Sequence, residues 1–380
     1  MTLLFNGNSN FNISSTNNAA LVSVGANTIQ FQSDTKNVIT IFSNTNVVFN
    51  GNSSFVLPIG NTANRPTGAN GMIRYSTDRT VEVFIGGTWS TVITSYNGQL
   101  LVVGGGAGGG GSPSYGGGGG GAGGYQTGVI VLVPGQLYYA NIGAGGLGTP
   151  AGTTSNGQNG LVSTFGNFYA YGGGGGGGGN SGQAMSGNLG ASGGGQGYAQ
   201  YGAFGFGLPP QGNNGGGVGV SNPGYYGGGG GANTAGSVVN GGSAAGGTGI
   251  VNPITGSTTG QLVSGQYWIC GGGASGGQNN LTPGQGGKGG GGNGGYYVNG
   301  VGYQAANNAT ANTGGGGGGG PLASLSAGNG SSGIIVLSVP TTNYSGAITS
   351  GGGPTGTYTT LANSGNTIIT WTYPGGTYLA

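Results

Sequence analysis

GGGGGGGG, residues 172–179, is the stretch that decides the fold of this chain. Similar glycine runs recur near 104–111, 116–124, 227–231, 271–277, 286–295 and 314–320. Glycine has no side chain to pack, so these runs offer only backbone N–H and C=O groups that a neighbouring segment can approach closely. Fixing the backbone costs roughly 1–2 kcal/mol per residue, so an ordered fold needs nearly all of these groups to be hydrogen-bonded.

Composition separates this chain from disordered glycine-rich sequences. The 106 glycines and 14 prolines together make 120 of 380 residues, a level typical of low complexity when no strict period is present. Disordered chains are usually highly charged, however, and this chain has only five Lys or Arg and three Asp or Glu residues. We therefore expect an ordered protein.

Helices of the polyproline II type can provide hydrogen-bond partners for the N–H and C=O groups of the glycine runs. Such a helix has three residues per turn, a rise of about 3.1 Å per residue and no internal hydrogen bonds, and only glycine lets such helices pack closely. The runs are mostly uninterrupted glycine rather than Gly-X-Y triplets, which excludes collagen. The sequence therefore predicts that the chain folds back into a bundle of polyglycine II helices, with larger side chains on its outer faces or in its loops.

Strand patterns surround this bundle. Residues 1–57 are polar and β-rich, and the heptapeptide Phe5–Phe11 returns as Phe49–Phe55, which indicates stacked units. Because this segment has little apolar surface of its own, we expect an oligomerisation segment that assembles as a homotrimer. Its expected strands are Leu21–Val24, Thr28–Phe31, Val38–Phe42 and Val47–Phe49.

The remaining strands define three further predicted domains. A small module at 58–96 pairs Met72–Tyr75 with Val81–Ile85, and its charged residues Arg74, Asp78, Arg79 and Glu82 are interpreted as a solvated hairpin surface. The glycine-rich domain at 97–333 opens with a strand at Leu100–Val103 and a hairpin around Pro134–Gly135. Residues 334–380 form a small C-terminal β-module. The predicted fold class is mostly β plus irregular structure, with almost no α-helix.

The composition argues against several functions. There is no histidine, and Asp34, Asp78 and Glu82 all precede the glycine domain, so we expect no enzyme, metal site or cofactor. A net charge of +2 disfavours nucleic-acid binding, and no run of about 20 apolar residues indicates membrane insertion. Met1–Phe11 lacks the features of a secretory signal peptide. Cys270 is expected to be buried and Lys288 solvated.

Two sets of motifs resemble bacteriophage proteins. Leu57-Pro58, Thr62–Pro66, Gly71–Tyr75 and Gly87–Trp89 are similar to a short module that recurs in phage tail fibres. From Val102 onward, the order of Val-Val-Gly-Gly-Gly, Val-x-Pro-Gly-Gln and Ile-Gly-Ala-Gly-Gly resembles the glycine-rich domain of phage tail proteins. The resemblance implies a virion location in a tail or other surface appendage, contacts with other tail or capsid proteins, and tip loops that touch a host glycan or outer-membrane protein.

Aromatic residues between the runs are the candidate receptor-binding residues, since rings on a rigid scaffold can stack on sugars or fill protein pockets. They are Tyr198, Tyr201, Phe204, Phe206, Tyr225, Tyr226, Tyr296 and Tyr297. The alternatives are that these rings only cover the sides of the bundle, and that the protein is a purely structural appendage or decoration protein. Ice binding would need a regular Thr or Ala face, which the irregular segments between the runs do not provide.

Overall fold

The computed structural model describes residues 57–77, 81–92, 95–179, 185–198, 203–218, 225–240, 242–277, 283–349 and 358–380, together with four strands between 21 and 49. The chain divides into two compact units. Unit 1 is Met1–Val92 and unit 2 is Ile93–Ala380.

Unit 1 contains two four-stranded sheets. The first is an antiparallel meander of β1 (Leu21–Gly25), β2 (Thr28–Ser33), β3 (Lys36–Phe42) and β4 (Val47–Phe49). These strands confirm the predicted ones, because each alternating run ends at Asn, Ser or Gly turn residues. The repeat at 5–11 and its echo after Phe49 lie outside the described residues, so the homotrimer stays a prediction.

The second sheet has the order β5-β6-β7-β8, and it includes the predicted pair of strands that carries Arg74 and Glu82. Its strands are β5 (Ile59–Gly60), β6 (Ile73–Ser76), β7 (Val81–Ile85) and β8 (Thr88–Val92), with a short 3₁₀ turn at Thr62–Asn64.

Arg74 and Glu82 were predicted to be solvated, yet they are 4% and 2% exposed. They face each other across β6 and β7, where their side chains form an ion pair. The Arg74 guanidinium also donates to the Asn61 carbonyl and lies 5.8 Å from the ring centroid of Trp89. The segment before β6 and this ring therefore cover a hairpin face that the sequence alone presents as open.

Unit 2 contains two five-stranded sheets. The order of the first is β10-β9-β21-β24-β23, and the order of the second is β13-β12-β11-β25-β22. Their bounds are β9 Tyr96–Val103, β10 Tyr125–Leu132, β11 Leu137–Asn141, β12 Ser163–Phe165, β13 Phe168–Ala170, β21 Ile334–Pro340, β22 Ile348–Thr349, β23 Tyr358–Asn363, β24 Asn366–Trp371 and β25 Gly376–Leu379, with a second 3₁₀ turn at Thr341–Asn343.

The pairing of these strands differs from the predicted hairpin around Pro134–Gly135. β10 pairs with β9, whereas β11 pairs with β12 and β25, so the turn leads from one sheet to the other. Strands after residue 334 join both sheets, and β21 lies between β9 and β24. The C-terminal strands therefore complete the sheets that the start of unit 2 begins.

Apolar side chains from both sheets form one core cluster. It unites Leu100 and Val102 of β9 with Phe165 of β12, Trp371 of β24 and Tyr378 of β25, all fully buried. A second cluster on the other side of β9 and β21 includes the side chains of Leu101, Val103, Ile334, Val336, Ile269 and Cys270. Because β9 and β21 are buried on both faces, their sequences read as continuous apolar runs.

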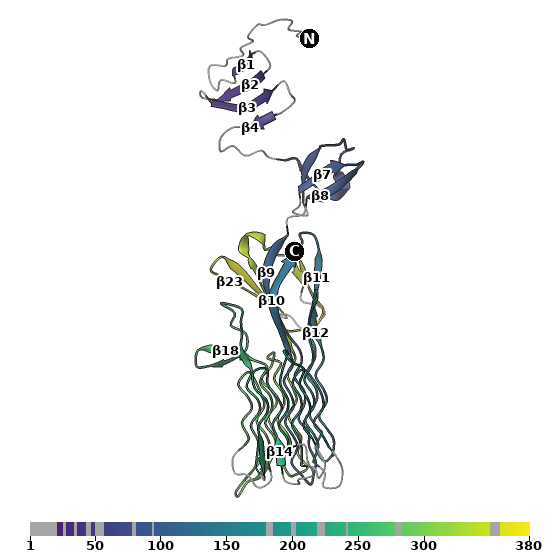
Figure 1. Ribbon diagram of the computed structural model, residues 1–380, viewed down its shortest axis with the longest axis vertical. Coiled ribbons are helices and arrows are strands. Elements are labelled where there is room, and N and C mark those ends of the chain that lie inside the picture. Colours follow the sequence, from purple (N-terminus) through teal and green to yellow (C-terminus); the bar gives the residue numbers. More distant parts are fainter. Residues whose placement is uncertain are drawn as a thin grey trace. The chain divides into compact units, whose positions relative to one another are not determined.

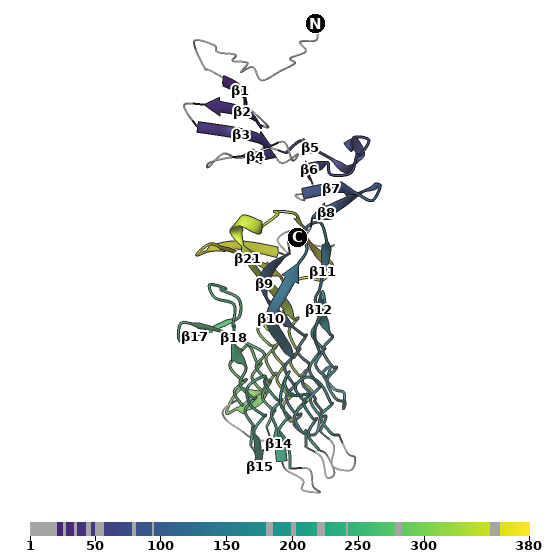
Figure 2. The same ribbon diagram turned by 45° about the horizontal axis from the view of Figure 1, so that its top comes forward.

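The glycine runs form a bundle of nearly parallel, undulating segments that extends away from these sheets (Figures 1 and 2). In helix 104–111, successive N–H groups donate in strict rotation to three neighbouring segments. Gly104, Ala107 and Gly110 donate to helix 116–124; Gly105 and Gly108 donate to helix 155–162; Gly106 and Gly109 donate to helix 326–333. This threefold rotation, with no glycine of the run at positive φ, is the polyglycine II arrangement.

Interior helices are surrounded on all sides. Three other segments, at 143–149, 172–179 and 314–320, donate to helix 104–111, which with its three acceptor helices makes six neighbours. Helix 116–124 likewise exchanges backbone hydrogen bonds with a full ring of segments. Most of the predicted runs are thus confirmed as buried segments that pack through their backbones, but the run at 286–295 is divided by a turn at 288–290, where Gly289 and Gly290 have positive φ.

Outer helices carry side chains in a triplet pattern. In helix 155–162, Gly157 and Gly160 face the interior, while Gln158, Asn159 and Leu161 are exposed. Three small antiparallel sheets sit at the ends of some helices. Two have two strands each, namely β14 (Tyr225–Gly227) with β15 (Val238–Asn240), and β19 (Tyr296–Val298) with β20 (Gly302–Gln304). The third has the order β16 (Ile250–Val251), β18 (Gln266–Ile269), β17 (Gln261–Val263).

Candidate binding surfaces

Chain direction assigns the loops of unit 2 to two ends of the bundle. Helix 104–111 leaves the sheets directly after β9, and successive helices alternate in direction. Every second connection therefore lies at the end away from the sheets. The described connections at that end are 112–115, 150–154, 296–303 and 321–325. We call this the loop end, and it includes β14 in Figures 1 and 2. Residues 180–184, 199–202, 219–224 and 278–282 are outside the described residues.

Three tyrosines from different segments meet at the loop end. The rings of Tyr115 and Tyr198 stack with centroids 4.5 Å apart and an interplanar angle of 7°. The Tyr198 ring also contacts Tyr226, with centroids 5.9 Å apart. Tyr115 and Tyr198 are partly exposed, whereas Tyr226 is fully buried beneath them, and burial raises the pKa of its phenol well above the usual range. We call these residues the tyrosine stack.

The tyrosine stack includes two predicted candidates and one residue that was missed. Part of the Tyr198 ring is exposed to solvent, whereas Tyr226 is buried and packs against it. Tyr115 was overlooked, although its position in the short loop between the first two glycine runs could have drawn attention to it.

The other described candidates at the loop end lie in two-stranded sheets. Tyr297 of β19 and Tyr303 of β20 pack edge to face, 5.0 Å between centroids, and Tyr296 beside them is partly exposed. Tyr225 starts β14, and Tyr201 lies outside the described residues.

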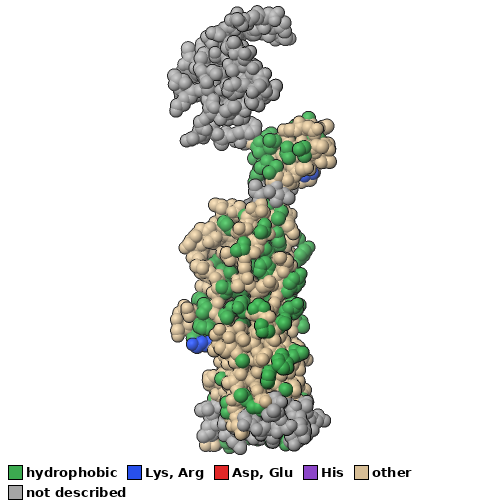
Figure 3. Space-filling view, viewed as in Figure 1, with side chains coloured by type: hydrophobic (Ala, Val, Ile, Leu, Met, Phe, Trp, Pro, Cys, Tyr) green, Lys and Arg blue, Asp and Glu red, His purple; other side chains and the backbone are tan. Residues whose placement is uncertain are grey.

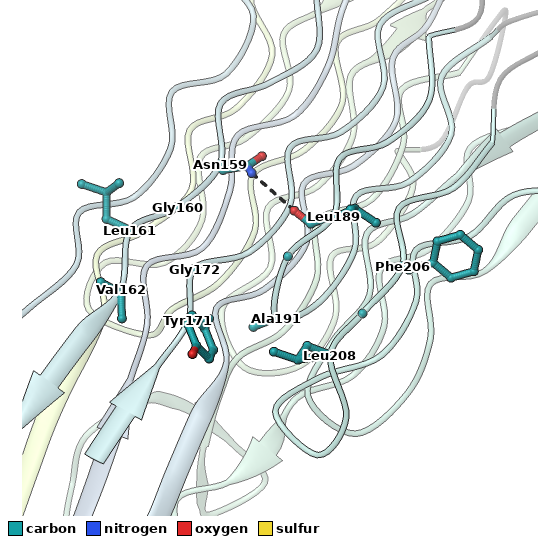
Figure 4. A pocket seen from close by; sticks show the side chains of 12 residues that line it. Asn159, Gly160, Leu161, Val162, Tyr171, Gly172, Leu189, Ala191, Phe206 and Leu208 are labelled. Carbon is teal, nitrogen blue, oxygen red and sulfur yellow. Dashed lines mark hydrogen bonds between the residues drawn. The ribbon is translucent and has the colours of Figure 1, made fainter. Parts of the chain in front are cut away.

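Phe204 and Phe206 lie elsewhere, on the flank of the bundle. They belong to helix 203–208 rather than to a loop, and their rings pack edge to face 5.2 Å apart. Phe206 is 59% exposed and lines a groove of about 490 Å³. We call it the flank groove; Figure 4 shows its lining residues, which are Asn159, Gly160, Leu161, Val162, Tyr171, Gly172, Leu189, Gly190, Ala191, Phe206, Gly207 and Leu208.

Charge is almost absent from these surfaces. Lys288 is the one charged residue that the sequence places after Val92, and it is exposed, with its ammonium 5.4 Å from the centroid of the Trp268 ring. On the face shown in Figure 3, green apolar side chains and tan atoms cover most of the described part of unit 2, apart from a small blue patch. The described residues contain no cluster of three or more His, Cys, Asp or Glu that could hold a metal ion.

The lone cysteine lies in the interior of unit 2. Cys270 is buried, as predicted, and burial raises the pKa of its thiol, so the sulfur stays protonated. Among the described residues, no helix has the length and apolar character needed to cross a membrane.

The family of the chain follows from a sequence comparison. A family model described as a glycine-rich domain matches residues 80–340, which spans the bundle and most of both sheets. No curated protein and no solved structure matches the chain. The matched region is well over half of the sequence, and the chain therefore belongs to the glycine-rich domain family.

Proposed function

We propose that this protein is a virion fibre or tail-tip protein that adheres to the host cell surface through the loop end of its glycine-rich bundle. The proposal includes assembly as a homotrimer with other virion proteins, a location on the extracellular particle, and no catalytic role. It rests on the phage-like motifs of the sequence and on the way the bundle displays its loops.

The tyrosine stack is the observation that carries the proposal. Its three rings come from segments far apart in the sequence, and the lattice behind them fixes their positions through backbone hydrogen bonds, such as the one from the Tyr198 N–H to the Gly116 carbonyl. Rings held this way lose little conformational entropy on binding, and the face of a tyrosine can stack on a sugar ring.

The chemistry of the partner follows from the lack of charge. Without acidic or basic side chains near the stack, recognition depends on stacking and on neutral hydrogen bonds. We therefore expect a host glycan, or an uncharged loop of an outer-membrane protein, and binding that changes little with salt concentration.

The experiment compares fluorescently labelled full-length chain with a Tyr115→Ala, Tyr198→Ala double variant on host cells and on a glycan array. The control is Tyr139→Ala, which removes a tyrosine that is 57% exposed on β11, in the sheets from which the bundle extends rather than at the loop end. We expect the double variant to lose binding while the control keeps it, with thermal unfolding confirming that both fold.

Equal binding by the double variant would reject the tyrosine stack as the contact site. If the wild-type chain decorates no susceptible host and virus lacking it still infects, a purely structural appendage is the better explanation.

A further inference from the structure

The flank groove lies where the hydrogen-bonding pattern of the bundle is interrupted. Because the helices have three residues per turn, the N–H groups of residues 172, 175 and 178 point to the same side. Within the described part of the chain, no backbone carbonyl accepts a hydrogen bond from these three N–H groups. Instead, the side-chain carbonyl of Asn159 accepts from the Gly175 N–H, and that of Asn156 accepts from the Gly178 N–H, each at 2.9 Å.

This ladder of asparagines stops one step early. Asn156 and Asn159 are three residues apart, and the next position in the series is Val162, whose side chain has no hydrogen-bond acceptor. Among the described residues, none accepts a hydrogen bond from the half-buried Gly172 N–H. Val162 and Gly172 both line the flank groove, so the groove opens where the ladder ends (Figure 4).

Seven of the twelve residues that line the groove have a backbone carbonyl that already accepts a hydrogen bond. Backbone N–H groups already donate to the carbonyls of Leu161, Tyr171, Gly172, Ala191, Phe206 and Leu208, and the Asn159 amide donates to that of Leu189. A ligand that fits this site should therefore bring an acceptor for the Gly172 N–H, whereas more than half of the lining carbonyls need no donor from it. Saccharides, which bring many hydroxyl donors, fit this requirement poorly.

The walls of the groove are apolar and aromatic. Tyr171 is 50% exposed on one side and Phe206 is 59% exposed on the other, with Leu189 and Leu208 between them, and no lining residue is charged. Grooves lined by aromatic rings are the usual docking sites of proline-rich segments, whose polyproline II conformation is already formed before binding.

We propose that the flank groove binds an uncharged, proline-rich segment of a partner protein in the polyproline II conformation. The segment occupies a position that the lattice leaves vacant, next to helices of the same three-residue geometry. Proline has no N–H group, so the segment needs no acceptor from the groove, and one of its free carbonyls accepts from the Gly172 N–H. Its rings pack against Tyr171 and Phe206. This site is separate from the tyrosine stack, so the two proposals stand or fall independently.

The test uses the full-length chain and a fluorescent, capped decaproline peptide in a polarisation titration. Two probes of other chemistry serve as comparisons: a capped Gly-Ser peptide of equal length, which lacks the preformed conformation, and a neutral oligosaccharide such as maltohexaose. We expect the decaproline peptide to bind more tightly than both.

The decisive variant is Val162→Asn, which extends the asparagine ladder and supplies an internal acceptor for the Gly172 N–H. It should leave the fold intact and weaken decaproline binding by at least roughly tenfold, because it removes both the free donor and an apolar wall. The matched control is Leu147→Asn on the adjacent outer helix, where the replaced side chain is 55% exposed and outside the groove.

Three results would overturn the proposal. The first is decaproline binding no tighter than that of the Gly-Ser peptide. The second is equal decaproline affinity for wild type and Val162→Asn. The third is saturable binding of the oligosaccharide without binding of the peptide, which would identify the groove as a saccharide site.

Discussion

Replacing a single interior glycine by alanine should weaken the whole bundle, and Gly316 is the sharpest place to show it. A Cβ at this position would lie 2.6 Å from the carbonyl carbon of Gly120 and closer still to its oxygen. Helix 116–124 cannot retreat, because neighbouring helices enclose it as well. The two helices must therefore separate by a large fraction of an ångström or more.

The structure gives the size of the effect. Gly117, Gly120 and Gly123 donate hydrogen bonds of 2.8–2.9 Å to the helix that contains Gly316. Losing or stretching these three bonds, at about 1 kcal/mol each, should lower the free energy of unfolding by about 3 kcal/mol. For a unit of this size that corresponds to roughly 5–10 °C in Tm.

Gly320→Ala provides a matched control within the same run. Gly320 is also buried, yet the nearest atom to its added Cβ would be 3.5 Å away, an ordinary contact. This variant should be neutral or more stable by about 0.4–1 kcal/mol, because alanine restricts the unfolded chain. Differential scanning fluorimetry and guanidinium titration of both variants make the comparison. Equal midpoints for Gly316→Ala and Gly320→Ala would refute the claim that backbone contact in the lattice sets stability.

Three further outcomes follow from single side chains. Asn159→Ala leaves the Gly175 N–H without its acceptor and should cost about 1–3 kcal/mol in guanidinium titration, whereas Gln158→Ala, on the exposed side of the same helix, should change stability by less than about 0.5 kcal/mol. Burial raises the pKa of Tyr226, so the folded state favours its neutral form; stability should be level below pH about 10 and fall above it by about 1.4 kcal/mol per pH unit, and Tyr226→Phe should remove that contribution to the slope. Glu82→Gln leaves a buried guanidinium without its counter-charge, which should cost about 3–5 kcal/mol and speed hydrogen exchange in β6 and β7; unchanged exchange would show that the ion pair does not stabilise unit 1.

Much of the architecture could be predicted because the sequence leaves few physical options. A run such as 172–179 has no side chains with which to form a core, so only a lattice of backbone hydrogen bonds can order it. The same reasoning placed large side chains on outer faces, and Leu147 and Leu161 are indeed exposed. Strands at Leu100–Val103 and Val81–Ile85 were recognised because their apolar patterns end at glycine or turn residues.

Other features depend on contacts between segments that are distant in the sequence, and the periodic pattern of residues does not reveal such contacts. The turn at Pro134–Gly135 is compatible both with a hairpin and with a connection between two sheets. The second arrangement forms because β11 pairs with other strands, among them β25, which is more than two hundred residues away. The burial of Arg74 depends on a ring that belongs to Trp89. The triplet pattern of the outer helices was missed because each one spans only a few residues.

The candidate site was only partly predictable for the same reason. Loop residues such as Tyr198 can be recognised as candidates by composition, but whether a ring is presented or buried depends on its neighbours in space. Tyr226 and Tyr198 have similar local sequences, each beside glycine, and yet one supports the other. The flank groove could not have been foreseen, because the role of Asn159 is visible only once its partner, the Gly175 N–H, is known.

The lattice separates the residues that stabilise unit 2 from those that can recognise a partner. Interior helices are held together by hydrogen bonds between backbone groups. Most of their positions have no room for a side chain, as at Gly118, where a Cβ would overlap the Gly195 carbonyl, although Ala107 and Ala122 are accommodated. Loop residues such as Tyr115 lie outside this network and can change without breaking its hydrogen bonds. Substitutions at crowded glycines such as Gly118 should therefore cost stability, whereas substitutions of exposed side chains at the loop end and along the flanks should leave the lattice intact, so the proposed binding surfaces can be altered by mutation without unfolding unit 2.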